Sequence, residues 1–255
     1  MIMLEDIRGK AVLVTGASTG IGAAAALEFG RLGANVAVHY NKNAEAAESV
    51  CAAIKKLGGK ALAIGGDLGV AGTAKRVVEE AAKQLGRLDI LLNNAGAMIR
   101  RSPFLELDAD LYDAAMNLNV RSVIEASQAA VPHMEKQGGG AIINVGSIAG
   151  SDGGGPGSGH YACAKAYVHN LTRHMARDLA ARKIRVNAIS PGVIETAFHA
   201  ATPPERMEAM KKAVPMGRAG TPEDCVGPIL FLASATMGGY VTGQILQVNG
   251  GQFMP

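Results

Sequence analysis

Residues 10–22 read KAVLVTGASTGIG, a short apolar run that leads into a loop with three glycines. Residues 20–33 continue from this loop as an Ala-rich stretch that predicts a helix. A strand that enters a helix through a glycine-rich loop is typical of a phosphate-binding site for a dinucleotide. We expect Gly16 to allow the tight turn, Gly20 to let the backbone approach a pyrophosphate, and Gly22 to let the helix pack closely on the sheet.

The same alternation continues along the chain. Short apolar runs predict strands, and longer amphipathic stretches between them predict helices. We expect further strands at 35–40, 60–68, 88–96, 141–147, 184–190 and 244–250, and further helices at 43–59, 70–86, 107–138 and 160–183. Strands separated by helices of this length indicate right-handed βαβ units. The predicted fold class is therefore α/β, a doubly wound parallel sheet with helices on both faces.

One segment breaks this alternation. Residues 198–220 are rich in Ala, Met and Lys and contain Pro203, Pro204 and Pro215, so they predict a helical insertion or a substrate lid. No linker or break in composition divides the 255 residues, which predicts a single domain over 1–255.

Composition excludes several classes of function. The net charge is +3 without a basic run, so a nucleic-acid partner is not expected. No apolar stretch reaches about 18 residues and no signal peptide is recognisable, so we expect no membrane span and a cytoplasmic location. Cys51, Cys163 and Cys225 form no C-x-x-C and predict small buried side chains. The six histidines show no ligand spacing, so no metal site is expected.

Tyr161 and Lys165 stand four residues apart in HYACAK, on one face of a predicted helix. A lysine cation near a phenol favours the phenolate, so we expect the pKa of Tyr161 to fall toward neutrality and the residue to act as general acid or base. Such pairs are common on helix surfaces. The catalytic interpretation rests on Ser147, because it ends a predicted strand at the edge where open parallel sheets bind ligands. Its hydroxyl could stabilise an alkoxide-like transition state.

Several short motifs occur along the chain in a fixed order. They are TGASTGIG at 15–22, NNAG at 93–96, the Tyr161 and Lys165 pair, PGVIET at 191–196 and TGQILQVNGG at 242–251. In order and spacing they resemble the short-chain dehydrogenase/reductase family over essentially the whole chain. The resemblance implies one Rossmann domain with a seven-stranded sheet, nicotinamide-dependent oxidoreduction and a homotetramer.

The resemblance also assigns roles to individual residues. Ser147, Tyr161 and Lys165 match the catalytic positions, although Gly146 stands where many relatives have a second serine. Spacing selects Asn119 over Asn117 as the residue that holds a proton-relaying water next to Lys165. The implied cofactor contacts are Gly16, Ser18, Thr19, Gly20, Ile21, Gly22, Tyr40, Asn41, Lys42, Asp67, Leu68, Asn94, Ala95, Gly96, Tyr161, Lys165, Pro191, Gly192, Ile194 and Thr196.

The end of the second predicted strand bears on the choice of nicotinamide. A carboxylate there would bind the ribose 2′-hydroxyl of NAD, but Tyr40 occupies the position and Asn41 and Lys42 follow. A nearby cation would pair with a 2′-phosphate, so NADP is favoured. NAD stays as an alternative for two reasons. Lys42 could be an ordinary solvated lysine, and Thr19 stands where NADP-preferring relatives often carry a basic residue. Asp67 is either the residue that meets the adenine amino group or an ordinary capping residue.

The sequence leaves several possibilities for the substrate. The nearest resemblances are to 3-oxoacyl-(acyl-carrier-protein) reductases and to sugar or polyol dehydrogenases. Arg182 matches one basic position of the acyl-carrier enzymes, whereas KQGGGA at 136–141 lacks the other. A dinucleotide-binding sensor without catalytic activity is the second hypothesis. The expected partner is a small carbonyl or alcohol substrate.

Overall fold

The computed structural model describes residues 4–196, 198 and 202–255. Seven parallel strands form one sheet in the order β3-β2-β1-β4-β5-β6-β7. Their bounds are β1 (Ala11–Val14), β2 (Asn35–Tyr40), β3 (Lys60–Gly65), β4 (Ile90–Asn93), β5 (Gly140–Val145), β6 (Ile184–Pro191) and β7 (Ile245–Val248). The predicted doubly wound parallel sheet is confirmed.

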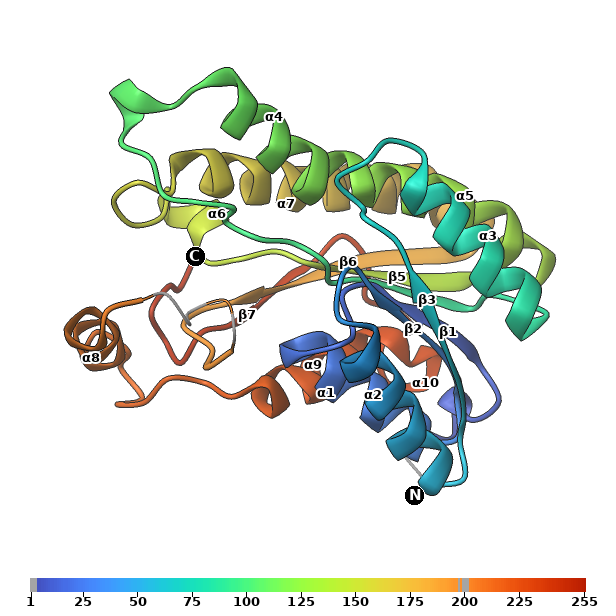
Figure 1. Cartoon of the computed structure of the whole chain (residues 1–255). Helices are drawn as coiled ribbons and strands as arrows, with labels where there is room; N and C mark the ends of the chain where they lie inside the picture. The colour runs from blue at the N-terminus through green and yellow to red at the C-terminus, as the bar shows by residue number, and fades with distance from the viewer. Residues whose placement is uncertain (1–3, 197, 199–201) are drawn as a thin grey trace.

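Helices cover both faces of the sheet (Figure 1), with α1, α2 and α9 on one face and α3, α5 and α7 on the other. The α-helices are α1 (Gly20–Arg31), α2 (Ala44–Lys56), α3 (Thr73–Leu85), α4 (Ala109–Met116), α5 (Ser122–Lys136), α6 (Ala149–Asp152), α7 (Gly159–Leu179), α8 (Pro204–Lys212), α9 (Pro222–Ala233) and α10 (Ala235–Gly238). Short 3₁₀ turns lie at η1 (Glu5–Ile7), η2 (Phe104–Glu106) and η4 (Ala180–Arg182).

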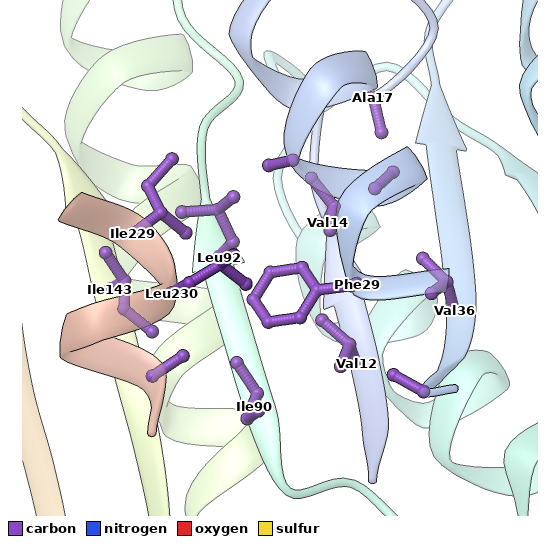
Figure 2. Packing of buried hydrophobic residues seen from close by; sticks show 14 of the residues in the cluster. Val12, Val14, Ala17, Phe29, Val36, Ile90, Leu92, Ile143, Ile229 and Leu230 are labelled. Atoms are coloured by element: carbon purple, nitrogen blue, oxygen red, sulfur yellow. The ribbon is translucent and has the colours of Figure 1, made fainter. Parts of the chain in front are cut away.

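Successive residues of each central strand face opposite layers of helices. In β1, Val12 and Val14 belong to the core under α1 and α9, while Leu13 belongs to the core under α3 and α5. Figure 2 shows Phe29 of α1 at the centre of the first core, with its ring between Val12 and Leu92. Phe29 is fully buried, and removing its ring from water stabilises the fold by about 2–3 kcal/mol. This packing fixes α1, and with it the loop that precedes it.

The long helix predicted over 107–138 is interrupted by a π-turn, η3 (Asn117–Arg121), between α4 and α5. The chain stays helical through the turn, but the extra residue rotates the side chains that follow. Asn119 lies within this turn and is fully buried. Single π-turns inside α-helices occur frequently at functional sites.

Candidate active site

A pocket of about 780 Å³ opens at the carboxyl ends of the strands, where the sheet order reverses between β1 and β4. Loops after β1, β2, β4, β5 and β6 line it together with parts of α7 and α8. Most predicted site residues lie on its wall: Gly16, Ser18, Thr19, Gly20, Ile21, Asn41, Lys42, Leu68, Asn94, Ala95, Gly96, Ser147, Tyr161, Lys165, Pro191, Gly192, Ile194 and Thr196. Gly22, Tyr40, Asp67 and Asn119 are not among the residues that line it.

The loop after β1 has the geometry that an anion-binding loop needs. Gly16 and Gly20 have φ angles of +62° and +58°, a region that other residues rarely adopt. The first turn of α1 contains no acidic residue, and the side chain of Thr19 does not cap it. Because Gly20 and Ile21 line the pocket, the free N–H groups of this turn are available to a phosphate, so the loop fits a dinucleotide.

Gly22 acts behind the loop, where the helix meets the neighbouring strand. A Cβ at this position would lie 2.5 Å from the carbonyl oxygen of Gly16 and 2.5 Å from Nδ2 of Asn94. Asn94 donates from that amide to the carbonyl oxygens of Thr15 and Gly16 at 2.8 and 2.9 Å. The hydroxyl of Thr15 in turn accepts the N–H groups of Asn94 and Ala95. These bonds join the loops after β1 and β4, and the role of buried Thr15 was not predicted.

At the end of β2 the structure differs from the prediction for Tyr40. Its ring packs over Gly65, where a Cβ would lie 2.9 Å from the phenol carbon, and not on the pocket. His39 lies on the pocket wall instead: Nδ1 accepts the N–H of Gly16 at 3.0 Å, so the proton sits on Nε2, 2.9 Å from the carbonyl oxygen of Gly66. Burial lowers the pKa of His39, which keeps the imidazole neutral. Lys42 lines the same end of the pocket.

Asp67 lies in the turn after β3, and its contact with the adenine amino group stays a prediction. Its side chain is exposed, and Oδ1 accepts the N–H of Gly69 at 2.9 Å. The carboxylate therefore holds a turn, while Leu68 beside it lines the pocket.

Three side chains meet at the middle of the pocket. Ser147 lies two residues beyond β5, and its hydroxyl is near enough to the phenol of Tyr161 on α7 to act on the pKa of that group. Lys165, one turn further along α7, donates from Nζ to the carbonyl oxygen of Val145 at 2.7 Å. Nζ lies 5.6 Å from the centre of the Tyr161 ring. The predicted cluster is thus brought together, with both α7 side chains buried.

The protonation of this cluster differs from the prediction. Burial raises the pKa of Tyr161 to about 12, although the hydroxyl of Ser147 acts in the opposite direction. Burial also lowers the pKa of Lys165 to about 8. The predicted fall of the Tyr161 pKa toward neutrality is therefore wrong for this structure. Desolvation outweighs the attraction of a cation whose ammonium is bonded to Val145 and not to the phenol.

Asn119 reaches the cluster from the π-turn. Its Oδ1 accepts the N–H of Ala97 at 3.2 Å. Its Nδ2 donates to the carbonyl oxygens of Ala97 at 3.0 Å and Ala115 at 2.9 Å. A Cβ at Gly96 would lie 2.7 Å from Oδ1 of Asn119 and 3.1 Å from Nζ of Lys165. Asn119 and Lys165 therefore approach the same backbone position, which suits a shared water.

His169 is a neighbour of the site that the sequence did not reveal. It is buried, and its Nε2 accepts the N–H of Ser147 at 3.4 Å. Any Cβ at position 146 would overlap this nitrogen, which explains why Gly146 precedes Ser147. Burial and then the charges of Lys165 and Arg173 lower the pKa of His169 to about 4.

The three cysteines differ in exposure. Cys51 and Cys225 are buried as predicted, but Cys163 is exposed on α7, so its predicted packing role is wrong. Among residues 4–196, 198 and 202–255 no group of His, Cys, Asp and Glu could hold a metal ion. No helix in this part of the chain is long and apolar enough to cross a membrane.

The far end of the pocket was not predicted in detail. Met98 and Arg101 line it from the segment after β4, Asp152 from the end of α6, and Phe198 and Met210 from the predicted lid segment. The rings of Phe198 and Tyr161 lie 5.5 Å apart between centroids. The predicted segment 198–220 therefore contributes to the wall beside Tyr161, although residues 199–201 lie outside the described part of the chain.

Comparisons with known proteins agree over nearly the whole chain. Residues 16–252 match the family described as enoyl-(acyl carrier protein) reductase. The chain is 40% identical over 245 residues to 3-oxoacyl-(acyl-carrier-protein) reductase FabG of Staphylococcus aureus, covering 96% of this chain and 98% of that protein. It is 40% identical over 254 residues to L-rhamnose 1-dehydrogenase (NAD(P)(+)) of Sphingomonas sp. strain SKA58, covering 98% and 99%. The structure of NADH-dependent reductase A1-R′ complexed with NAD has a TM-score of 0.89 and 34% identity, covering 99% of this chain and 100% of that chain.

Proposed function

The chain belongs to the short-chain dehydrogenase/reductase family and is an oxidoreductase that uses a nicotinamide dinucleotide; we propose that it uses NADP(H) and reduces a carbonyl group on a small molecule. The observation that carries this proposal is the placement of Ser147, Tyr161 and Lys165 in the same pocket as the glycine loop. A cofactor phosphate and a substrate oxygen could be held there at the same time.

We propose that Tyr161 is the general acid. When bound, the nicotinamide supplies a hydride to the carbonyl carbon. Tyr161 holds its proton, because burial raises its pKa to about 12, and donates it to the carbonyl oxygen. The hydroxyl of Ser147, on the same pocket wall, donates a hydrogen bond to that oxygen, and the Lys165 ammonium stabilises the phenolate left behind. Asn119 holds a water through which Lys165 returns a proton to Tyr161.

The test of this role is Tyr161→Phe, with Tyr167→Phe on the same helix as the matched control. Tyr167 is 46% exposed and does not line the pocket. We expect Tyr161→Phe to lower kcat by at least about a hundredfold while NADPH binding is retained. The control should keep wild-type turnover. Substantial activity in Tyr161→Phe would overturn the assigned acid.

We propose that Lys42 directs the preference for NADP. It lines the pocket beside Asn41 and His39, and no carboxylate ends β2. A 2′-phosphate at this end would pair with Lys42, as cations pair with phosphate elsewhere. The test compares NADPH with NADH in a carbonyl panel, using Lys42→Ala and the exposed α2 residue Lys55→Ala as control. We expect Lys42→Ala to lose preference for NADPH; a wild-type preference for NADH by tenfold or more would contradict the proposal.

A 3-oxoacyl-(acyl-carrier-protein) reductase is the more specific alternative function, and one observation weakens it. Arg182 precedes β6, at the edge of the sheet opposite the pocket, and its guanidinium pairs with Glu135 at 3.2 Å. In one copy of the chain it does not approach the site entrance. A catalytically inactive sensor would bind NADPH without turnover on any carbonyl or alcohol of the panel, so the same assay tests it.

We further propose that residues 1–255 work as one catalytic domain, with 198–220 as its substrate lid. The support is that Phe198, Met210 and Ala213 line the pocket beside Tyr161. The family resemblance also favours a cytoplasmic homotetramer. Light scattering on the purified protein tests the tetramer, and a monomer at micromolar concentration would contradict it.

A further inference from the structure

Arg101 on the pocket wall and Arg206 beside it, next to the lining residue Gly155, form no ion pair with an acidic side chain in the described part of the chain. Arg101 lines the pocket, and its guanidinium donates one hydrogen bond within the described chain, to the carbonyl oxygen of Pro156 at 2.7 Å. Arg206 makes no hydrogen bond or ion pair with any residue in this part of the chain. By contrast Arg100, next in sequence, pairs with Asp108. A guanidinium has five N–H donors, so most of those on Arg101 and Arg206 are available.

The two arginines face each other across the glycine loop that precedes Tyr161. Arg101 packs on Gly157, and a terminal nitrogen of Arg206 would lie 3.3 Å from a Cβ at Gly155. Arg206 stands one turn before Met210 on α8, so it shares the helix face that lines the pocket. Partial burial and the charge of Arg206 together lower the pKa of Arg101, which shows that the two cations repel each other.

Like charges held together without a counterion favour an anionic ligand. Asp152 also lines the pocket, but its Oδ1 accepts the N–H of Gly154 at 2.8 Å, and it forms no ion pair with either arginine in the described structure. Arg101 and Tyr161, the proposed proton donor, line the same pocket. The anion would therefore belong to the substrate, because Lys42 is associated with the opposite, cofactor end of the pocket.

We propose that Arg101 and Arg206 bind a carboxylate of the substrate, so that the enzyme reduces small oxo acids to hydroxy acids. The inference rests on the proposed function. A planar carboxylate matches the two-pronged geometry of a guanidinium, and one such group between the two arginines removes their repulsion. Tyr161 would deliver the proton to the keto oxygen as the keto carbon takes the hydride that a bound nicotinamide would supply, and the carboxylate stays unchanged.

Binding can be measured without turnover in the presence of NADP⁺, because an oxo acid and an oxidised nicotinamide cannot react. The probes are 2-oxobutanoate, 4-oxopentanoate and 5-oxohexanoate, each with its methyl ester, titrated calorimetrically into the wild type and into Arg101→Gln and Arg206→Gln. The exposed α8 residue Lys212→Gln removes the same charge from the same helix and is the control. We expect at least one acid to bind about ten- to a hundredfold more tightly than its ester. Arg101→Gln and Arg206→Gln should reduce this ratio, and Lys212→Gln should leave it unchanged.

The proposal is overturned if every ester binds the wild type as well as its acid, or if the arginine variants lose acid and ester binding equally. Kinetics with NADPH separate this failure from failure of the proposed function. Turnover of neutral carbonyls that Tyr161→Phe abolishes, without preference for acids, would overturn only the carboxylate site. Turnover that survives Tyr161→Phe would overturn the assigned acid, whichever substrates bind.

Discussion

Replacing Gly22 by alanine should uncouple the loops that form the cofactor end of the pocket. The new Cβ would lie 2.5 Å from the carbonyl oxygen of Gly16 and 2.5 Å from Nδ2 of Asn94, closer than real Cβ contacts. The clash with Gly16 would strain the packing of α1, and the clash with Asn94 would take its amide out of its bonds to Thr15 and Gly16. Overpacking costs about 1–3 kcal/mol, and each lost hydrogen bond costs about 1 kcal/mol.

A glycine in another helix provides the control. Gly227 in α9 has no atom within 4 Å of a built Cβ, so alanine there should stabilise the protein by about 1 kcal/mol through helix propensity. The same gain applies at Gly22, so we expect a net loss there of about 2–4 kcal/mol. Urea unfolding at one protein concentration measures both, and an NADPH fluorescence titration should show at least about tenfold weaker binding for Gly22→Ala. If Gly22→Ala is as stable as Gly227→Ala and binds NADPH normally, the close packing of this helix is not required.

Two further predictions concern buried titratable groups. His169 has a pKa of about 4 in the folded chain and about 6.5 when unfolded, so stability is complete above pH 6.5 and should fall by about 3 kcal/mol toward pH 4. Urea unfolding at both pH values should show a smaller loss for His169→Asn; an identical loss would contradict the assignment. Lys165→Met should abolish turnover but raise stability at pH 7 by about 2 kcal/mol. The folded pKa of Lys165 is about 8, so burial of its ammonium costs about 3 kcal/mol at pH 7, and the lost hydrogen bond to Val145 offsets about 1 kcal/mol of this gain. The gain should shrink as the pH rises through 8 toward 10.5, and a less stable variant at pH 7 would refute the argument.

The sequence predicted the sheet and most of the pocket wall for a simple physical reason. Strands covered on both faces are short apolar runs, and their carboxyl ends meet at one edge, so the loops that follow them converge. Side chains at a strand end are harder to predict, because neighbouring residues point to opposite faces. Tyr40 and His39 illustrate this: the Tyr40 ring packs beside β3, and His39 contacts the loop after β1.

Contacts between segments far apart in the sequence could not be predicted from motifs or periodicity. His169 is 22 residues from Ser147, and no motif connects them, yet its ring determines that position 146 is glycine. Arg101 follows β4 among residues without periodicity, and Arg206 lies in the segment that departs from the strand and helix alternation. The prediction for the pKa of Tyr161 was wrong for a related reason. The spacing of the two residues shows that Lys165 is near, but it does not show how deeply the phenol is buried, and burial decides the pKa.

The charges around the pocket connect the proposed acid with the proposed substrate. Among the described residues, the lining holds the cations Lys42, Lys165 and Arg101 and a single carboxylate, that of Asp152. A substrate carboxylate beside Tyr161 would raise the pKa of the phenol further, because it disfavours a second negative charge, and proton transfer would slow. Pairing that carboxylate with Arg101 and Arg206 cancels its field at the phenol. Removing Arg101 should therefore lower affinity for an oxo acid, and it should lower kcat for the oxo acid more than kcat for a neutral carbonyl.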